Sequence, residues 1–108
     1  MRDRTILSSR EQCELRRIGH DLNVVVQVGD GGLSDGLVAE VQRALDDHEL
    51  IKVRLPAIER KDRAAAAAAL CEATGATQVQ AIGRVVLLYL KAEEPDPKKS
   101  NILRNRLG

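Results

Sequence analysis

The sequence predicts an α/β fold in the order α-β-α-β-α-β-β, with a four-stranded mixed sheet packed by three helices. Segments with apolar residues at helical spacing alternate with shorter runs rich in valine, isoleucine and leucine, which is typical of strand–helix–strand units. The loop Gly83-Arg84 separates the last two apolar runs and has glycine first, as in a tight hairpin. The 108 residues, 44% of them hydrophobic, are enough for one domain around a single core.

The first helix has a clear start and end in the sequence. Residues 1–7 are expected to be a flexible N-terminus, followed by the folded domain over residues 8–90. Ser8 and Glu11 have the spacing of a capping box, which predicts that a helix begins there. Gly19 is expected to end this helix.

A buried strand and a second helix follow. Residues 24–28 begin with three consecutive valines, which predict a strand covered on both faces, as in a largely parallel sheet. Ser34 or Asp35 is expected to cap the next helix, which extends to about Asp47. Its apolar stripe has the spacing i, i+4, i+8 and consists of Leu37, Val41 and Leu45.

Residues 50–55 alternate in polarity, which predicts a strand with two different faces. His48-Glu49 is expected to fix the corner between the preceding helix and this strand. Lys52 and Arg54 point to the face opposite the apolar set Ile51, Val53 and Leu55.

The second half of the domain is predicted to be a helix and a hairpin. Six consecutive alanines, residues 64–69, favour a helix that continues through Leu70, Cys71 and Ala73 and packs close to the sheet. Residues 59–63 are its charged lead-in. Gly75 is expected to stop this helix. Residues 77–82 and 85–90 are the two predicted hairpin strands.

Composition limits the function classes. Seventeen Lys and Arg against sixteen Asp and Glu give a net charge of +1, so only a local cluster of bases could indicate a nucleic-acid partner. Tyr89 is the single Phe, Trp or Tyr residue, which excludes a base-stacking platform of surface aromatics. The tail, residues 91–108, has no apolar period and is expected to be disordered and basic at its end.

The cysteines and the hydropathy pattern predict a cytoplasmic protein without a membrane partner. Cys13 and Cys71 lie far apart and have no Cys-x-x-Cys companion, so no zinc site or disulfide is expected, only buried or half-buried thiols. No apolar run approaches a membrane-spanning length, and the N-terminus lacks the apolar core of a signal peptide.

The candidate site is the glycine turn that follows the first strand. Gly29 and Gly32 form a Gly-x-x-Gly pattern, with Gly31 between them, and the turn leads into a helix start, where anions bind. The turn lacks the Lys-Ser/Thr of a nucleotide-hydrolase loop and the spacing of a dinucleotide loop. In K-homology modules such a loop clamps nucleotide backbone. The alternative is a tight strand-to-helix connection without any ligand.

Three cations could accompany the loop: Lys52, Arg54 and Arg84. Each also has a simple alternative, as part of a solvated strand face or as an exposed turn tip. The sequence shows no acid/base pair, nucleophile with a His–Asp partner, or metal cluster. We therefore expect no enzymatic activity, no metal and no cofactor.

Seven stretches carry a resemblance to a known family: residues 15–22, 24–29, 32–34, 47–53, 75–76, 79–84 and 86–89. Together they resemble the CRM domain, the chloroplast RNA splicing and ribosome maturation module, and in particular its stand-alone bacterial form, the YhbY family. The resemblance covers about residues 8 to 89. Within it, the glycine loop and the stretch DHELIKV are the most specific features in combination.

The resemblance implies a fold similar to the C-terminal domain of bacterial translation initiation factor three. It also implies RNA binding through the glycine loop and nearby cations. Asp30 lies inside this loop and belongs to the predicted site, although its carboxylate opposes phosphate electrostatically. The predicted RNA-binding residues are Gly29, Asp30, Gly31, Gly32, Lys52, Arg54 and Arg84.

The predicted function is RNA binding during assembly of the large ribosomal subunit, because the single-domain bacterial members are associated with precursors of that subunit. The expected partner is ribosomal RNA of the precursor, with ribosomal proteins as further partners, and the expected state is a monomer. Basic tail residues would add non-specific affinity: Lys98, Lys99, Arg104 and Arg106. The alternatives are an adaptor that docks on a ribosomal protein and, third, a small enzyme for a phosphorylated ligand.

Overall fold

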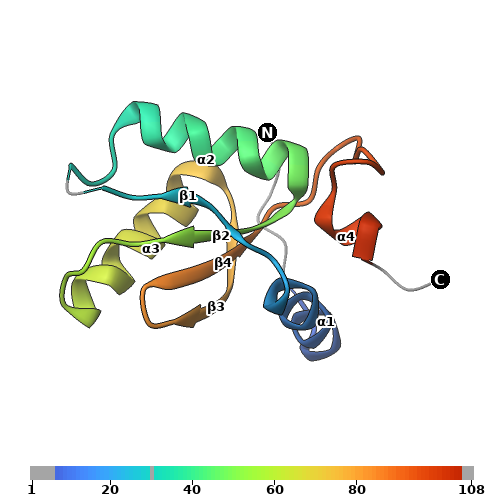
Figure 1. The fold of residues 1–108 in the computed structure, drawn as a ribbon, viewed down its shortest axis with the longest axis horizontal. Coiled ribbons are helices and arrows are strands. Elements are labelled where there is room, and N and C mark those ends of the chain that lie inside the picture. Colours follow the sequence, from blue (N-terminus) through green and yellow to red (C-terminus); the bar gives the residue numbers. More distant parts are fainter. Residues whose placement is uncertain (1–6, 30, 106–108) are drawn as a thin grey trace.

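The predicted order of elements is confirmed, with one helix more than expected (Figure 1). The computed structural model describes residues 7–29 and 31–105. The elements are α1 (Ser9–His20), β1 (Val24–Gln27), α2 (Asp35–His48), β2 (Leu50–Arg54), α3 (Arg60–Thr74), β3 (Thr77–Ile82), β4 (Val85–Tyr89) and α4 (Asn101–Asn105).

The helix boundaries follow from local chemistry. The Ser8 side chain accepts a hydrogen bond from the backbone N–H of Glu11, whose side chain accepts from Ser8 N–H, so the predicted capping box forms. Ser34 caps α2 through its bond from Leu37 N–H. Gly75 ends α3 in the left-handed region, at φ 82°, where glycine has no Cβ penalty.

The strand order in the sheet is β1-β2-β4-β3. β1 is parallel to β2, whereas β4 is antiparallel to both of its neighbours, which confirms the mixed sheet. The expectation that β1 is covered on both faces is wrong, because Val26 is the only buried one of its four described residues and both Val25 and Gln27 are exposed. β1 also lies at the edge of the sheet. Val25 is an extra residue in its register and is 46% exposed.

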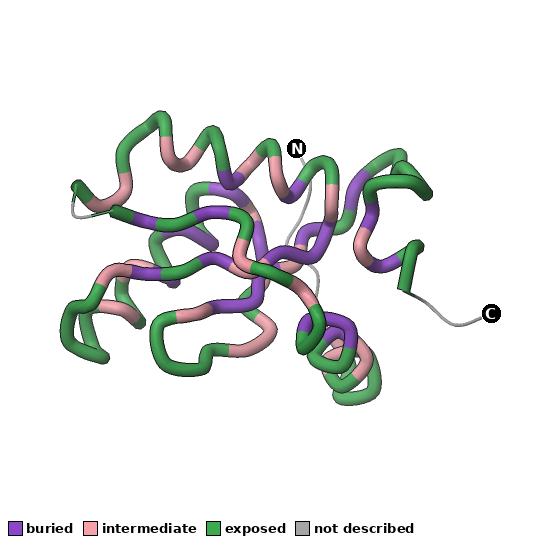
Figure 2. Tube along the Cα trace, viewed as in Figure 1, coloured by how far each residue is buried: buried purple, intermediate pink, exposed green. Residues whose placement is uncertain are grey.

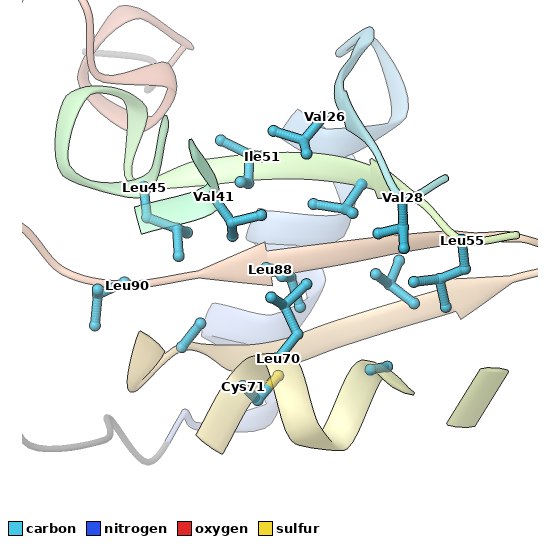
Figure 3. Close-up of a cluster of buried hydrophobic side chains, with 14 residues drawn as sticks. Val26, Val28, Val41, Leu45, Ile51, Leu55, Leu70, Cys71, Leu88 and Leu90 are labelled. Atoms are coloured by element: carbon cyan, nitrogen blue, oxygen red, sulfur yellow. The ribbon is translucent and has the colours of Figure 1, made fainter. Parts of the chain in front are cut away.

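The main core lies between the sheet and the two helices α2 and α3 (Figure 3). Val41 and Leu45 reach it from α2, and Leu70 reaches it from α3. From the sheet, Ile51 and Leu88 point into the same cluster. The two helices therefore cover most of this face, whereas Gln78 and Ala81 of β3 stay exposed. This arrangement confirms the apolar stripes predicted for α2 and β2.

The opposite face of the sheet is covered only in part. A second cluster joins Leu15 and Ile18 of α1, Leu50 of β2, Leu87 of β4 and Ile102 of α4. These residues cover the end of the sheet where β2 begins, and the other end of this face stays open. Cys13 on α1 is exposed rather than half-buried, because it lies outside the stripe that packs on the sheet.

The prediction of a disordered tail is wrong for residues 91–105. Ala92 and Ser100 are buried, and Ser100 is inaccessible to solvent. The segment returns to the α2–β2 corner, where Asn101 Nδ2 donates to the Leu50 carbonyl at 2.7 Å. Side chains such as Asn101 supply hydrogen bonds that a search for apolar periodicity does not detect. Within the described ranges, no helix has the length and apolarity needed to cross a membrane.

Candidate nucleic-acid interface

The glycine loop is a compact turn at the end of β1. Gly32 N–H donates to the Gly29 carbonyl at 3.0 Å, and Ser34 N–H donates to the Gly32 carbonyl at 3.2 Å. Gly32 has φ +72°, so glycine is required there by backbone conformation. Asp30, which the sequence includes in the site, lies outside the described residues.

Open space surrounds the loop glycines. A Cβ added at Gly29, Gly31 or Gly32 would meet no atom within 4 Å. Gly29 and Gly31 are exposed, and neither has a positive φ that would require glycine. The free fold therefore does not explain why these two positions lack side chains, whereas close approach of another molecule would.

A backbone hydrogen bond brings the loop beside the basic strand. Val28 N–H, directly before Gly29, donates to the Arg54 carbonyl at 2.8 Å. The Arg54 side chain is exposed, whereas Lys52 is half-buried and its Nζ donates to the His20 carbonyl at 3.4 Å. Both side chains lie on the face of the sheet opposite α2 and α3, as the alternation predicts.

Arg84 is located at the same end of the sheet but is held more firmly. Its Nε donates to the Leu55 carbonyl at 3.0 Å, and Leu55 N–H donates back to the Arg84 carbonyl at 2.6 Å. The residue is exposed, so the hydrogen bond orients its guanidinium group without removing it from solvent. Arg84 therefore has both a structural contact and a charge available to a ligand.

The structure thus gathers the described candidate residues at one end of the sheet. The loop, the end of β2 and the β3–β4 hairpin all lie at the side of Figure 1 away from α4, and the tube is exposed there over most of its length (Figure 2). Lys52 lies nearer the middle of β2, where its side chain reaches the end of α1 at His20.

Beside these cations, the uncovered part of the sheet forms a hollow with a volume of about 390 Å³. None of the described residues that line it is acidic: they are His20, Leu22, Asn23, Val24, Lys52, Arg54, Gln80, Ile82, Val85 and Leu87. Sequence reasoning missed the contribution of Gln80 and Ile82. Their alternate positions in β3 were a signal that they share a face.

A second hollow, of about 430 Å³, lies on the other side of the hairpin beside the start of α3. Arg60 and Arg63 line it together with Gly83. Arg63 already donates to the Ile58 carbonyl, and the neighbouring Lys61 pairs with Glu59 at 3.9 Å. The described lining of this hollow has no acidic residue either, but Glu59 and Asp62 adjoin its two arginines in the chain. These carboxylates reduce the positive charge at this end of α3, which makes it less favourable for an anion than the β2 face.

The geometry defines a small α/β domain with an open glycine loop and an adjoining basic sheet face. The chain belongs to the CRS1/YhbY (CRM) domain family, whose model matches residues 7–89. Among the residues that the structure describes, no group of three His, Cys, Asp or Glu side chains could hold a metal ion.

Several relatives are similar over nearly their whole length. A probable RNA-binding protein of Pseudomonas aeruginosa is 43% identical over 98 residues, which cover 91% of this chain and 94% of the relative. An RNA-binding protein of Haemophilus influenzae is 40% identical, covering 83% of this chain and 91% of the relative. The probable RNA-binding protein YqeI of Bacillus subtilis is 33% identical, covering 82% of this chain and 93% of the relative.

A solved structure has the same fold. The solution structure of a Staphylococcus aureus protein, described as a hypothetical protein proposed to bind RNA, superimposes with a TM-score of 0.73 at 29% identity. The match covers 82% of this chain and 93% of the other. This likeness confirms the α/β fold class predicted from the sequence.

Proposed function

We propose that this protein binds RNA and contacts the phosphate backbone with the glycine loop, Lys52, Arg54 and Arg84. The observation that carries the proposal is the hydrogen bond from Val28 N–H to the Arg54 carbonyl, which joins the loop to the basic strand. Backbone amides and cations are the usual partners of phosphate oxygens. The names of the relatives, which are RNA-binding proteins, support the same partner.

The cations of the β2 face carry more of this binding than the loop. Asp30 and Asp35 place negative charge in the loop and at the first turn of α2, which opposes an anion there. The hollow beside Lys52 and Arg54 has no acidic residue among its described lining. The loop glycines therefore allow the RNA backbone to come close, and the β2 residues Lys52 and Arg54 provide most of the positive charge.

The proposed RNA is ribosomal, from the precursor of the large ribosomal subunit, and the protein acts in its assembly without catalysing a reaction. The resemblance to stand-alone bacterial CRM proteins supports this partner, and the match to the family over residues 7–89 strengthens the resemblance. Recognition relies more on RNA shape than on base stacking, since the chain has one tyrosine and no Phe or Trp.

The test is binding to fragments of ribosomal RNA over a salt series. If cations neutralise phosphates, the logarithm of the binding constant falls linearly with the logarithm of the salt concentration. The magnitude of this slope decreases by about 0.7 to 0.9 for each phosphate contact that is lost. We expect Lys52→Ala/Arg54→Ala to reduce both affinity and slope, and Gly31→Val to reduce affinity with less change in slope. Arg43→Ala on the exposed side of α2 is the matched control and should retain binding.

Two results would redirect the proposal. Binding that persists in all variants would place the RNA elsewhere, for example on the cations of α1. The absence of RNA binding at every salt concentration would contradict the proposal and favour the adaptor that docks on a ribosomal protein. Sequencing of RNA recovered with the tagged protein from cells tests the ribosomal part, with large-subunit precursor RNA as the expected enrichment.

A further inference from the structure

The floor of the hollow beside Lys52 follows two rows of residues that are paired across the sheet. The pairing register aligns Val24, Lys52, Leu87 and Gln80 in one row. In the next row on the same face it aligns Gln27, Arg54, Val85 and Ile82, of which Gln27 does not line the hollow. Residues that face each other in register share one face of a sheet, so each row presents its side chains together.

The two halves of this floor differ in chemistry. β2 contributes the cations Lys52 and Arg54, whereas β4 and β3 contribute apolar side chains and the amide of Gln80. Ile82 is 67% exposed, more than any other large hydrophobic residue among those described. Adjacent strands are about 4.8 Å apart, so the charged half and the Ile82 edge are separated by about 10 Å.

A nucleotide has the same division, with an anionic phosphate at one end and a flat, largely apolar base with a polar edge at the other. We propose that this hollow binds one unstacked nucleotide of single-stranded RNA. The phosphate lies at Lys52 and Arg54, the base covers Ile82 and Val85, and the Gln80 amide bonds the base edge. This inference rests on the RNA binding proposed above and adds that the site takes a single-stranded segment.

Three observations favour this occupant. The charge of the lining is complementary to phosphate, since its described residues include two cations and no carboxylate. Exposed Ile82 beside the half-buried Val85 offers an apolar surface, and bases removed from a stack are held between aromatic or apolar side chains. His20 at the end of α1 and Leu22 just after it also line the hollow, whose volume of about 390 Å³ accommodates one nucleotide.

A base that is paired within an A-form helix cannot cover Ile82, because its faces are stacked on its neighbours. The proposal therefore predicts that the contribution of Ile82 depends on the strandedness of the RNA. A purely electrostatic surface would contact only the phosphates of either form, so Ile82 would contribute equally to the affinity for single-stranded and double-stranded RNA.

The experiment measures binding of a labelled single-stranded RNA and of a duplex containing the same strand, each over a salt series. Ile82→Ser should weaken single-strand binding about tenfold, as the loss of one apolar contact implies, with unchanged salt slope. The same variant should leave duplex binding unchanged. Val25→Ser is the matched control, because Val25 is 46% exposed and does not line this hollow.

A second variant tests the base edge without removing apolar surface. Gln80→Leu should reduce the differences in affinity among oligonucleotides of different base composition. Equal losses of single-strand and duplex binding in Ile82→Ser, or no loss, would overturn the nucleotide site while wild-type binding still supports the proposed function. If the wild type binds neither RNA, both proposals are wrong.

Discussion

The Ser100 hydroxyl donates a 2.6 Å hydrogen bond to a carboxylate oxygen of Glu49, across 51 residues of chain. The other carboxylate oxygen accepts from Ala92 N–H at 2.8 Å. Glu49 is itself 4% exposed and has φ +64° at the corner between α2 and β2. Residues other than glycine rarely adopt this backbone conformation. One buried carboxylate therefore holds the helix–strand corner and the C-terminal segment together.

Ser100→Ala should lower the free energy of unfolding by about 1–3 kcal/mol, because it leaves a buried carboxylate oxygen without this donor. Urea denaturation measures the effect. Ser9→Ala, at an exposed position of α1, is the control and should change stability little. Equal stability of both variants would mean that the Glu49–Ser100 bond contributes nothing to the native state.

Ile102→Ala should destabilise the protein by about 2 kcal/mol or more, since it removes a buried side chain from the cluster with Leu15, Ile18 and Leu50. The adjacent Leu103 is 40% exposed, so Leu103→Ala should cost much less. Thermal unfolding compares the two variants, which change neighbouring positions of α4. If both leave the midpoint unchanged, α4 does not pack on α1 in solution.

Gly19 of α1 lies directly against the Leu87 side chain of β4. A Cβ there would lie 2.5 Å from Leu87 Cδ2, so Gly19→Ala should destabilise the fold by about 1–3 kcal/mol despite the better helix propensity of alanine. Gly36→Ala in α2, whose Cβ would meet only Ser34 Oγ at 3.9 Å, should be neutral or slightly stabilising.

A double-mutant cycle can show whether Gly19→Ala destabilises the fold through the clash with Leu87 or through a general effect of replacing glycine. A second change, Leu87→Val, shortens the side chain that meets the new Cβ. The unfolding free energies of the double-mutant cycle should show favourable coupling between positions 19 and 87. Purely additive effects would contradict the steric explanation.

Two neighbouring loop glycines should respond differently to alanine. Gly32 has φ +72°, so Gly32→Ala should lower stability by about 1 kcal/mol through backbone strain. Gly31 has open space and no positive φ, so Gly31→Ala should leave the unfolding midpoint unchanged. Chemical denaturation of both variants tests this difference, and a loss of stability in Gly31→Ala would show that the loop is constrained in the free protein.

Much of the fold was predictable because its signals are local. Ser8 and Glu11 form their capping box within one turn of helix, and Gly75 ends α3 through its own backbone conformation. The apolar stripe of α2 and the alternation of β2 each follow from the geometry of a single element. The glycine loop was a candidate site from its own residues, which the family resemblance supported, and the geometry places that loop beside Arg54.

The errors concern partners that are distant in the chain. Three valines predicted a strand covered on both faces, but β1 lies at an edge and Val25 is exposed. The tail was predicted to be disordered because it lacks apolar periodicity. Ser100 and Asn101 anchor residues 91–105 through hydrogen bonds to Glu49 and Leu50, and no rule based on local pattern contains such bonds.

The sequence by itself determined the elements from α1 to β4, their order, the capping residues and the absence of an aromatic stacking platform, since each depends on residue type and short-range spacing. Only the tertiary structure decided which strands lie at the edges, which part of the sheet stays uncovered, and that Gln80 and Ile82 share a face with Lys52 and Arg54. These features depend on the pairing register and on the packing of α1, which join residues distant in the chain.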